Sequence, residues 1–307
     1  MRLSSAQFNK IVQSSIQTST TGINTALLQM SSGKKMLSAS DDPLGSVQLM
    51  MLDREQSNIN QYQKNISNLR TQLGQSESFL NGANNAQLRA QELVSSILNA
   101  SNNTPEGREA IASELEGILE QLVGIANSQD PNGDYVLSGT KTETQPVVRD
   151  PKTGDFIYQG NDKERMVSVA EGTSLPCNKT AESIFFGNDS DGSDIFNSID
   201  NIIKVLRDPT IEGDSLKESV GSVGKNINDS LADLGSALTD IGAQQGALDR
   251  ISGAHEDNSL LNSKLIGDIE NVDMGEVTLA LKSHMAALQA TQMTYTQIQS
   301  LSLFKMM

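Results

Sequence analysis

The feature that most constrains the fold is a stripe of side chains along residues 59–101 whose spacing alternates strictly between three and four. Ten of its thirteen positions are apolar. This spacing places one side chain per turn on a single face of a helix. We therefore predict a helix over residues 44–101, roughly 85 Å long. A helix of that length needs a partner along most of its face. The stripe consists of Ile59, Tyr62, Ile66, Leu69, Leu73, Ser76, Leu80, Ala83, Gln87, Ala90, Val94, Ile97 and Ser101.

A second long helix is predicted over residues 214–270. Its stripe also alternates steps of four and three and ends at Leu248. Near Ser252 we expect the stripe to change phase toward Leu261 and Leu265, which would alter supercoiling locally. Two shorter helical patterns lie between the long helices, over residues 105–128 and 195–206. The stripe of the long helix over residues 214–270 consists of Ile227, Leu231, Leu234, Leu238, Ile241, Gln245 and Leu248.

The segment between residues 134 and 187 has a different character. Short β-type runs alternate with turn formers such as the Asp-Pro-Lys-Thr-Gly that ends at Gly154, which is typical of a small β-rich insert. With this insert at its centre, the chain must run out and come back, so the long helices pair antiparallel and the two ends lie together. The runs are Tyr135–Leu137, Pro146–Val148, Phe156–Tyr158 and Met166–Val169.

These patterns predict a mainly α fold with a small β domain: an elongated antiparallel bundle of long helices, a β-rich insert at its distal end, and paired terminal helices. We expect three domains. They are a terminal coiled-coil domain for polymerisation (1–43 and 271–307), a helical-bundle domain (44–140 and 191–270) and the β-rich insert (141–190).

Both ends of the chain lack charge. Residues 11–33 and 285–304 contain no Asp, Glu, Lys or Arg, yet they are rich in Ser, Thr and Gln. That polarity excludes membrane-spanning helices. Composition leaves two alternatives, disordered ends or helices buried against other protein. Stripes with helical spacing run through both segments, at Val12, Ile16, Ser19, Ile23, Ala26 and Met30, and at Val277, Leu281, His284, Leu288, Thr291, Tyr295 and Ile298.

Catalytic and metal-binding patterns are scarce. The chain has two histidines, His255 and His284, and one cysteine, Cys177, which cannot form an internal disulfide. A zinc site usually needs three or four convergent ligands, so we expect both histidines to have structural or solvated roles. The net charge of −15 argues against nucleic acid and anionic membrane as partners. We predict no enzyme activity, no cofactor and no metal; a soluble signalling coiled coil or an enzyme stays as an alternative.

Two acidic motifs have simpler interpretations. Asp41 or Asp42 can cap the helix that follows, with Pro43 in its first turn, which is a better use of adjacent carboxylates than acid–base chemistry. Residues 188–194 resemble a calcium loop faintly, but the first ligand position would be Gly187, so a solvated acidic linker is expected. The start, residues 1–10, lacks the pattern of a cleaved secretory signal.

Two terminal motifs resemble bacterial flagellins and their relatives. Residues 29–35 (QMSSGKK) and 40–43 (SDDP) are similar to the N-terminal signature of that superfamily, and residues 286–290 (AALQA) with 301–304 (LSLF) are similar to the C-terminal one. Residues 132–139 (NGDYVLSG) resemble the hook-associated branch of the superfamily more than filament flagellin. The closing residues 305–307 depart from the pattern.

The resemblance implies a structural adaptor at the flagellar hook–filament junction, outside the cell. It implies export by the flagellar type III apparatus, a cytoplasmic export chaperone, and assembly as a ring of copies between the first junction protein and flagellin. A filament-forming flagellin subunit is the alternative. The resemblance and the stripes together predict an assembly interface at Val12, Ile16, Ile23, Met30, Ser31, Ser32, Gly33, Leu281, His284, Leu288, Tyr295, Ile298 and Leu301.

Overall fold

The computed structural model describes residues 5–99, 103–187 and 194–303. The chain forms two compact units. Unit 1 comprises Met1–Ile59 and Glu256–Met307, and unit 2 comprises Asn60–His255. The division into three domains stays a prediction.

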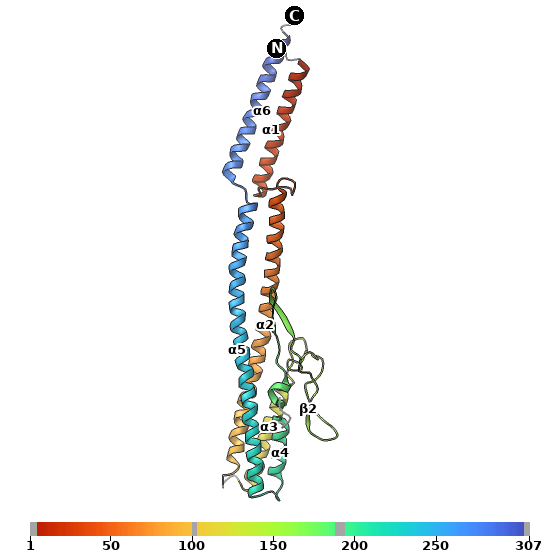
Figure 1. Ribbon diagram of the computed structural model, residues 1–307, viewed down its shortest axis with the longest axis vertical. Coiled ribbons are helices and arrows are strands. Elements are labelled where there is room, and N and C mark those ends of the chain that lie inside the picture. Colours follow the sequence, from red (N-terminus) through yellow and green to blue (C-terminus); the bar gives the residue numbers. More distant parts are fainter. Residues whose placement is uncertain (1–4, 100–102, 188–193, 304–307) are drawn as a thin grey trace. The chain divides into compact units, whose positions relative to one another are not determined.

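Long helices dominate the chain, and α2 and α5 run side by side (Figure 1). The residue numbers of the paired side chains decrease along α2 as they increase along α5. In unit 2, Gln87 Nε2 donates to Ser230 Oγ (3.0 Å), and Gln245 Nε2 donates to Glu77 Oε2 (2.9 Å). The predicted antiparallel pairing is thus confirmed. The helices of unit 2 are α2 (Pro43–Ser96), α3 (Pro105–Ala126), α4 (Ile195–Arg207) and α5 (Asp214–Glu270), of which α2 and α5 continue into unit 1.

The stripe predicted on α2 forms the core of unit 2. Every member from Ile66 to Ile97 is at most 2% exposed, including the polar Ser76 and Gln87. Tyr62 is half-buried, and Ser101 lies outside the described residues. The amide nitrogen of Gln87 donates to Ser230 of α5, and this hydrogen bond offsets part of the cost of burying the side chain.

The expected change of phase on α5 is wrong. Leu261 and Leu265 are 54% and 40% exposed, whereas His255 and Asn262 are 8% and 4% exposed. The buried positions therefore continue with the same spacing along α5, but their side chains change from apolar to polar. Hydrophobicity alone located the wrong face because the buried positions here are occupied by His and Asn.

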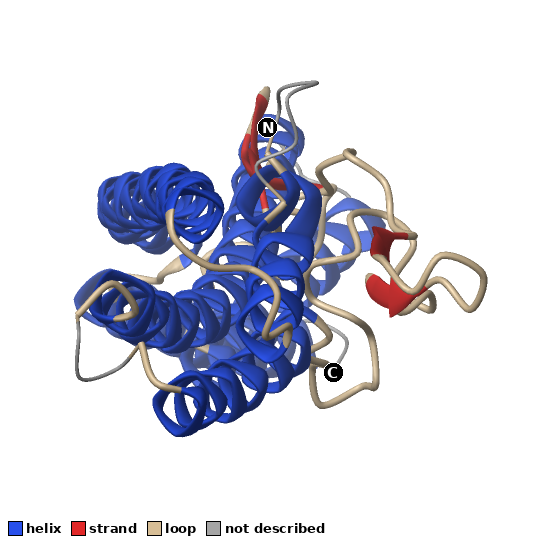
Figure 2. Ribbon diagram, turned by 90° about the horizontal axis from the view of Figure 1, so that it is seen from below, coloured by secondary structure: helices blue, strands red, loops and turns tan. Residues whose placement is uncertain are grey.

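The insert between α3 and α4 contains two antiparallel strand pairs, β1 with β2 and β3 with β4, which lie on the outside of the helices (Figure 2). Three of the four predicted runs form strands. The run from Tyr135 to Leu137 does not, although Tyr135 forms an isolated bridge to Gln129. A π-helical turn was not predicted. The elements are β1 (Val147–Arg149), β2 (Phe156–Tyr158), β3 (Met166–Ala170), β4 (Thr173–Pro176) and η1 (Glu182–Phe186).

Two asparagines attach the β1–β2 hairpin to the helices. The Asn127 side chain, just after α3, accepts from Val147 N and donates to Val147 O, both at 2.9 Å. Asn197 in α4 does the same for Phe156 of β2, at 2.7 and 2.9 Å. Each amide satisfies one donor and one acceptor of a strand, as a neighbouring strand would.

The β3–β4 hairpin is attached at a β-bulge. Its register shifts between Ser168 and Ala170. Asn65 Nδ2 donates to Ser168 O (2.8 Å), and His255 Nε2 lies 2.8 Å from Val169 O while its ring stacks on Tyr62. A bulge leaves backbone groups outside the ladder, and donors on α2 and α5 meet them here. This hairpin therefore lies along the side of the helices rather than at their far end.

Candidate assembly interface on the terminal helices

Unit 1 contains the pair of terminal helices, α1 (Ser5–Ser32) and α6 (Met274–Leu303), which lie side by side (Figure 1). The pairing is antiparallel. Ser15 Oγ lies 3.2 Å from Thr291 Oγ1, and further along α1 Gly22 faces His284. α6 starts at a cap, because Asp273 Oδ1 accepts from Gly275 N at 2.7 Å. The predicted pairing of the terminal helices is confirmed.

The residues of the QMSSGKK motif connect α1 to the start of α6. Gly33 ends α1 with φ +71°, a left-handed conformation that glycine adopts without strain. Its carbonyl then accepts from Val272 N (3.0 Å), and Lys35 N donates to Glu270 O (2.7 Å). The Lys34 ammonium bonds the Glu270 carboxylate, which raises the pKa of Lys34. The motif thus has a structural role inside a single chain.

The two adjacent acids have separate tasks. Asp42 Oδ1 accepts from Gly45 N at 3.0 Å and caps α2 ahead of Pro43. Asp41 Oδ2 instead accepts from Leu37 N and Ser38 N and holds the preceding turn. Cap formation is confirmed for Asp42, and Asp41 organises the connector.

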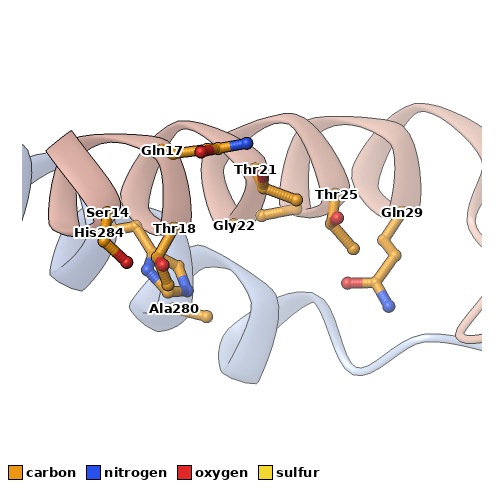
Figure 3. A pocket seen from close by; sticks show the side chains of 10 residues that line it. Ser14, Gln17, Thr18, Thr21, Gly22, Thr25, Gln29, Ala280 and His284 are labelled. Carbon is orange, nitrogen blue, oxygen red and sulfur yellow. The ribbon is translucent and has the colours of Figure 1, made fainter. Parts of the chain in front are cut away.

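At Gly22, α1 lies directly against the side chain of His284 in α6. A Cβ built there would lie 2.6 Å from two atoms of the His284 ring, which is too close for any real side chain. Figure 3 shows the ring of His284 beside Gly22 and Thr18. Glycine in mid-helix lowers helix stability, and here it provides the space that the imidazole occupies.

The pair buries very little. Among the described side chains of α1 and α6, only Val12, Ser19, Ala26 and Val277 are buried. The other predicted stripe positions are half-buried, except Ile298, which is exposed. A two-helix pair with so small a core contributes little hydrophobic stabilisation, at about 25 cal/mol per Å² of apolar surface removed from water.

Two of the open grooves along the described part of the pair contain predicted interface residues. One, of about 620 Å³, is lined by small hydroxyl side chains such as Ser14, Thr18 and Thr21, together with His284 (Figure 3). The other, of about 700 Å³, is mostly apolar. Leu27 and Met285 stand at its edge and are 50% and 55% exposed. The apolar lining residues are Ile23, Leu27, Leu281, Met285, Ala286 and Leu288.

The predicted interface residues fall into three groups. The first lies between the helices or at the apolar groove: Val12, Ile16, Ile23, Met30, Leu281, His284, Leu288 and Tyr295. The second lies at the end of α1, where Ser31 and Ser32 are exposed and Gly33 makes the turn. In the third, Ile298 is 39% exposed, and Leu301 lies in α6 with its side chain outside the described part. Their role in assembly stays a prediction.

Several residues of this site were not predicted. Gly22 had a signal, a glycine in mid-helix within an uncharged segment, but nothing in the sequence paired it with His284. Leu27 and Met285 lie off the stripes and so were not selected, although they border the apolar groove. Glu270 and Val272 bind the QMSSGKK motif from a position 235 or more residues away, which no local pattern reveals.

Other chemistry gives no competing site. Within the described ranges, no group of three His, Cys, Asp or Glu side chains is placed to hold a metal ion. No helix in this part of the chain has the length and apolarity needed to cross a membrane. The acidic residues 188–193 lie outside the described residues, and Asp194 caps α4.

Comparisons with known proteins point in one direction. The family described as bacterial flagellin N-terminal helical region matches residues 3–142. Flagellar hook-associated protein 3 of Salmonella typhimurium is 30% identical over 295 residues, covering 91% of this chain and 90% of that protein. Its Escherichia coli counterpart is 28% identical with the same coverage. A solved structure from Vibrio parahaemolyticus, described as flagellar hook-associated, is 33% identical, with a TM-score of 0.69, and covers 75% of this chain and 100% of that one.

Proposed function

This chain belongs to the family of flagellar hook-associated protein 3 (FlgL), a structural protein of the flagellar hook–filament junction, and from that premise we propose how its two ends assemble. It is a structural protein of the flagellum and not an enzyme. We propose that a ring of copies joins the first junction protein to flagellin, and that α1 and α6 form the assembly interface.

One observation carries the proposal: apolar side chains are exposed mainly in unit 1. Of the twenty large apolar side chains that are exposed in the described residues, four lie in unit 2 (Leu88, Leu98, Ile157 and Met166) and the other sixteen lie in unit 1. Exposed apolar patches mark interaction sites. Because α1 and α6 carry almost no charge and share so small a core, contact with other subunits supplies the burial that the isolated pair lacks.

The same weakness fits export. A thinly buried helix pair opens at little cost, and an open chain is suited to threading through a narrow channel. We propose export through the flagellar type III apparatus, with a cytoplasmic chaperone covering the apolar side of α6 beforehand.

Deletion of the gene tests the function. We expect cells that form hooks without filaments and release flagellin into the medium, seen by negative-stain microscopy and by blotting of the medium. Expression of the intact gene from a plasmid should restore filaments. Normal filaments in the deletion strain would contradict the proposal.

The rival function, a filament-forming flagellin, predicts a different behaviour. Purified flagellin should extend into long tubes when seeded, whereas a junction protein should stop after a ring. The coverage of the relatives favours the junction role: the hook-associated relative spans 91% of the chain, whereas three flagellins span 43%, 68% and 48% of it.

A further inference from the structure

We propose that unit 1 carries a second docking face, on α2 and α5, that binds an amphipathic helix of a neighbouring subunit whose apolar stripe is flanked by Lys or Arg. The docking face consists of Leu44, Val47, Met51, Leu261 and Leu265. They are 71%, 48%, 66%, 54% and 40% exposed. This face is separate from the α1–α6 interface and does not depend on it.

Helical geometry places these residues on one side of the α2–α5 pair. On α2, Gly45 and Leu52 lie at inward positions, and Leu44 and Met51 each precede one of them by one residue. On α5, Leu261 likewise precedes the buried Asn262 by one residue. One residue is a rotation of about 100°. In antiparallel helices the same rotation away from the partner leads to the same side of the pair. The pairing in this stretch is shown by Gln56 Nε2, which donates to Ser259 Oγ at 2.8 Å.

Burial on the two long helices differs between the units. In unit 2, side chains of α3, α4 and the insert join those of α2 and α5 in one core. In unit 1, buried positions on the pair are few, and include Gly45, Ile59 and Asn262. No described residue of the chain buries the docking face. A helix laid along it would complete a bundle of the kind that unit 2 already forms.

Charge indicates what kind of helix fits. Glu55, Asp257 and Asp268 lie three or four residues from Met51, Leu261 and Leu265, and so border the docking face. Residues 43–59 and 256–270 contain five acidic side chains, not counting Glu270, which pairs with Lys34. The same two ranges contain only two basic side chains, Arg54 and Lys264. Two copies of this face would repel each other. A partner with apolar residues and flanking cations is complementary.

Peptide binding tests the proposal on the full-length protein. Two labelled 18-residue helical peptides share one Leu stripe and differ only in flanking residues, Lys in one and Glu in the other. By fluorescence anisotropy at low salt, we expect the Lys peptide to bind at least about tenfold more tightly, since exposed charges are weakly screened there. Equal affinity for the two peptides would end the proposal.

Matched variants locate the binding. Met51→Ser with Leu261→Ser removes two apolar side chains from the docking face, and we expect it to weaken Lys-peptide binding at least about tenfold. The control is Met50→Ser with Leu260→Ser, on the same helices one residue earlier, where the native side chains are 69% and 73% exposed. We expect the control to bind as the unchanged protein does. An equal effect of both pairs would refute this site, whatever the outcome of the gene deletion.

Discussion

At the scale of single residues, Asp194 shows how burial and hydrogen bonding compete. Its carboxylate caps α4, accepting from Phe196 N at 2.9 Å and Asn197 N at 3.2 Å, and it also accepts from the Asn197 side chain. These bonds favour the ionised form, but burial outweighs them and raises the pKa of Asp194 to about 6. The cap therefore holds α4 and, through Asn197, strand β2, at the cost of a poorly solvated charge.

This balance predicts a pH effect. Because the pKa is higher in the folded state, the folded chain binds more protons, and the contribution of Asp194 to the free energy of unfolding falls as pH rises from about 4 to 6. Asp194→Asn keeps a capping oxygen and removes the charge. Between pH 4 and pH 7, we expect the free energy of unfolding of the variant to rise relative to that of the unchanged protein by up to about 3 kcal/mol. Urea unfolding followed by circular dichroism measures this difference.

Asp208 provides the control. Its side chain is only partly buried, and hydrogen bonds from Thr210 lower its pKa, so Asp208→Asn should lose stability relative to the unchanged protein as pH rises. The same pH trend in both variants would show that burial of Asp194 is not the cause.

At the scale of elements, the terminal helices α1 and α6 come close together at Gly22. Gly22 leaves the space for the His284 ring, and the rest of the pair is thinly buried. In the middle of α3, a Cβ built on Gly117 would meet no atom within 4 Å beyond the adjoining backbone of its own helix and its chain neighbours, so the two glycines differ in the space around them.

We expect Gly22→Ala to weaken the α1–α6 pair by about 1–3 kcal/mol, because the added methyl group overlaps the imidazole. Hydrogen exchange in residues 277–291 should quicken, while α2 and α5 in unit 2 should be unchanged. Gly117→Ala should instead stabilise α3 by up to about 1 kcal/mol.

A second substitution tests the cause. His284→Ala in the Gly22→Ala background removes the overlap and should restore slow exchange in α6. Persistent fast exchange in the double variant would mean that Gly22 is needed for something other than the ring of His284.

At the scale of the whole molecule, the two units differ in how they gain stability. Unit 2 has a continuous core that runs through four helices and the insert. Unit 1 contains sixteen of the twenty large apolar side chains that are exposed in the described residues, and it buries few. One unit is therefore expected to be stable by itself, and the other to gain its stability on assembly.

Removal of residues 285–307 tests this division. We expect the long helices to keep their helicity by circular dichroism at 222 nm, since their core lies in unit 2. We expect the truncated protein to be absent from the ends of hooks, detected by immunogold labelling. Normal incorporation of the truncated protein would contradict the assembly role of α6.

The long stripes determined most of the fold from the sequence alone. Periodicity of three and four predicted α2, α5 and the paired ends, since helix formation and burial of a stripe follow from local spacing. Local spacing failed at Leu261 and Leu265, which are exposed because the buried positions beside them are polar. It also missed η1 and the role of Tyr135, which depend on packing of the insert.

Only the tertiary structure decided which residues meet across the chain. Gly22 and His284, Lys34 and Glu270, and His255 and Val169 are pairs far apart in sequence, and no periodic pattern encodes them. The docking face on α2 and α5 likewise became visible only when the two helices were placed side by side. The physical reason is that the spacing of residues along a chain sets which face of a helix is buried, whereas complementary shape and hydrogen bonding between distant segments set what that face touches.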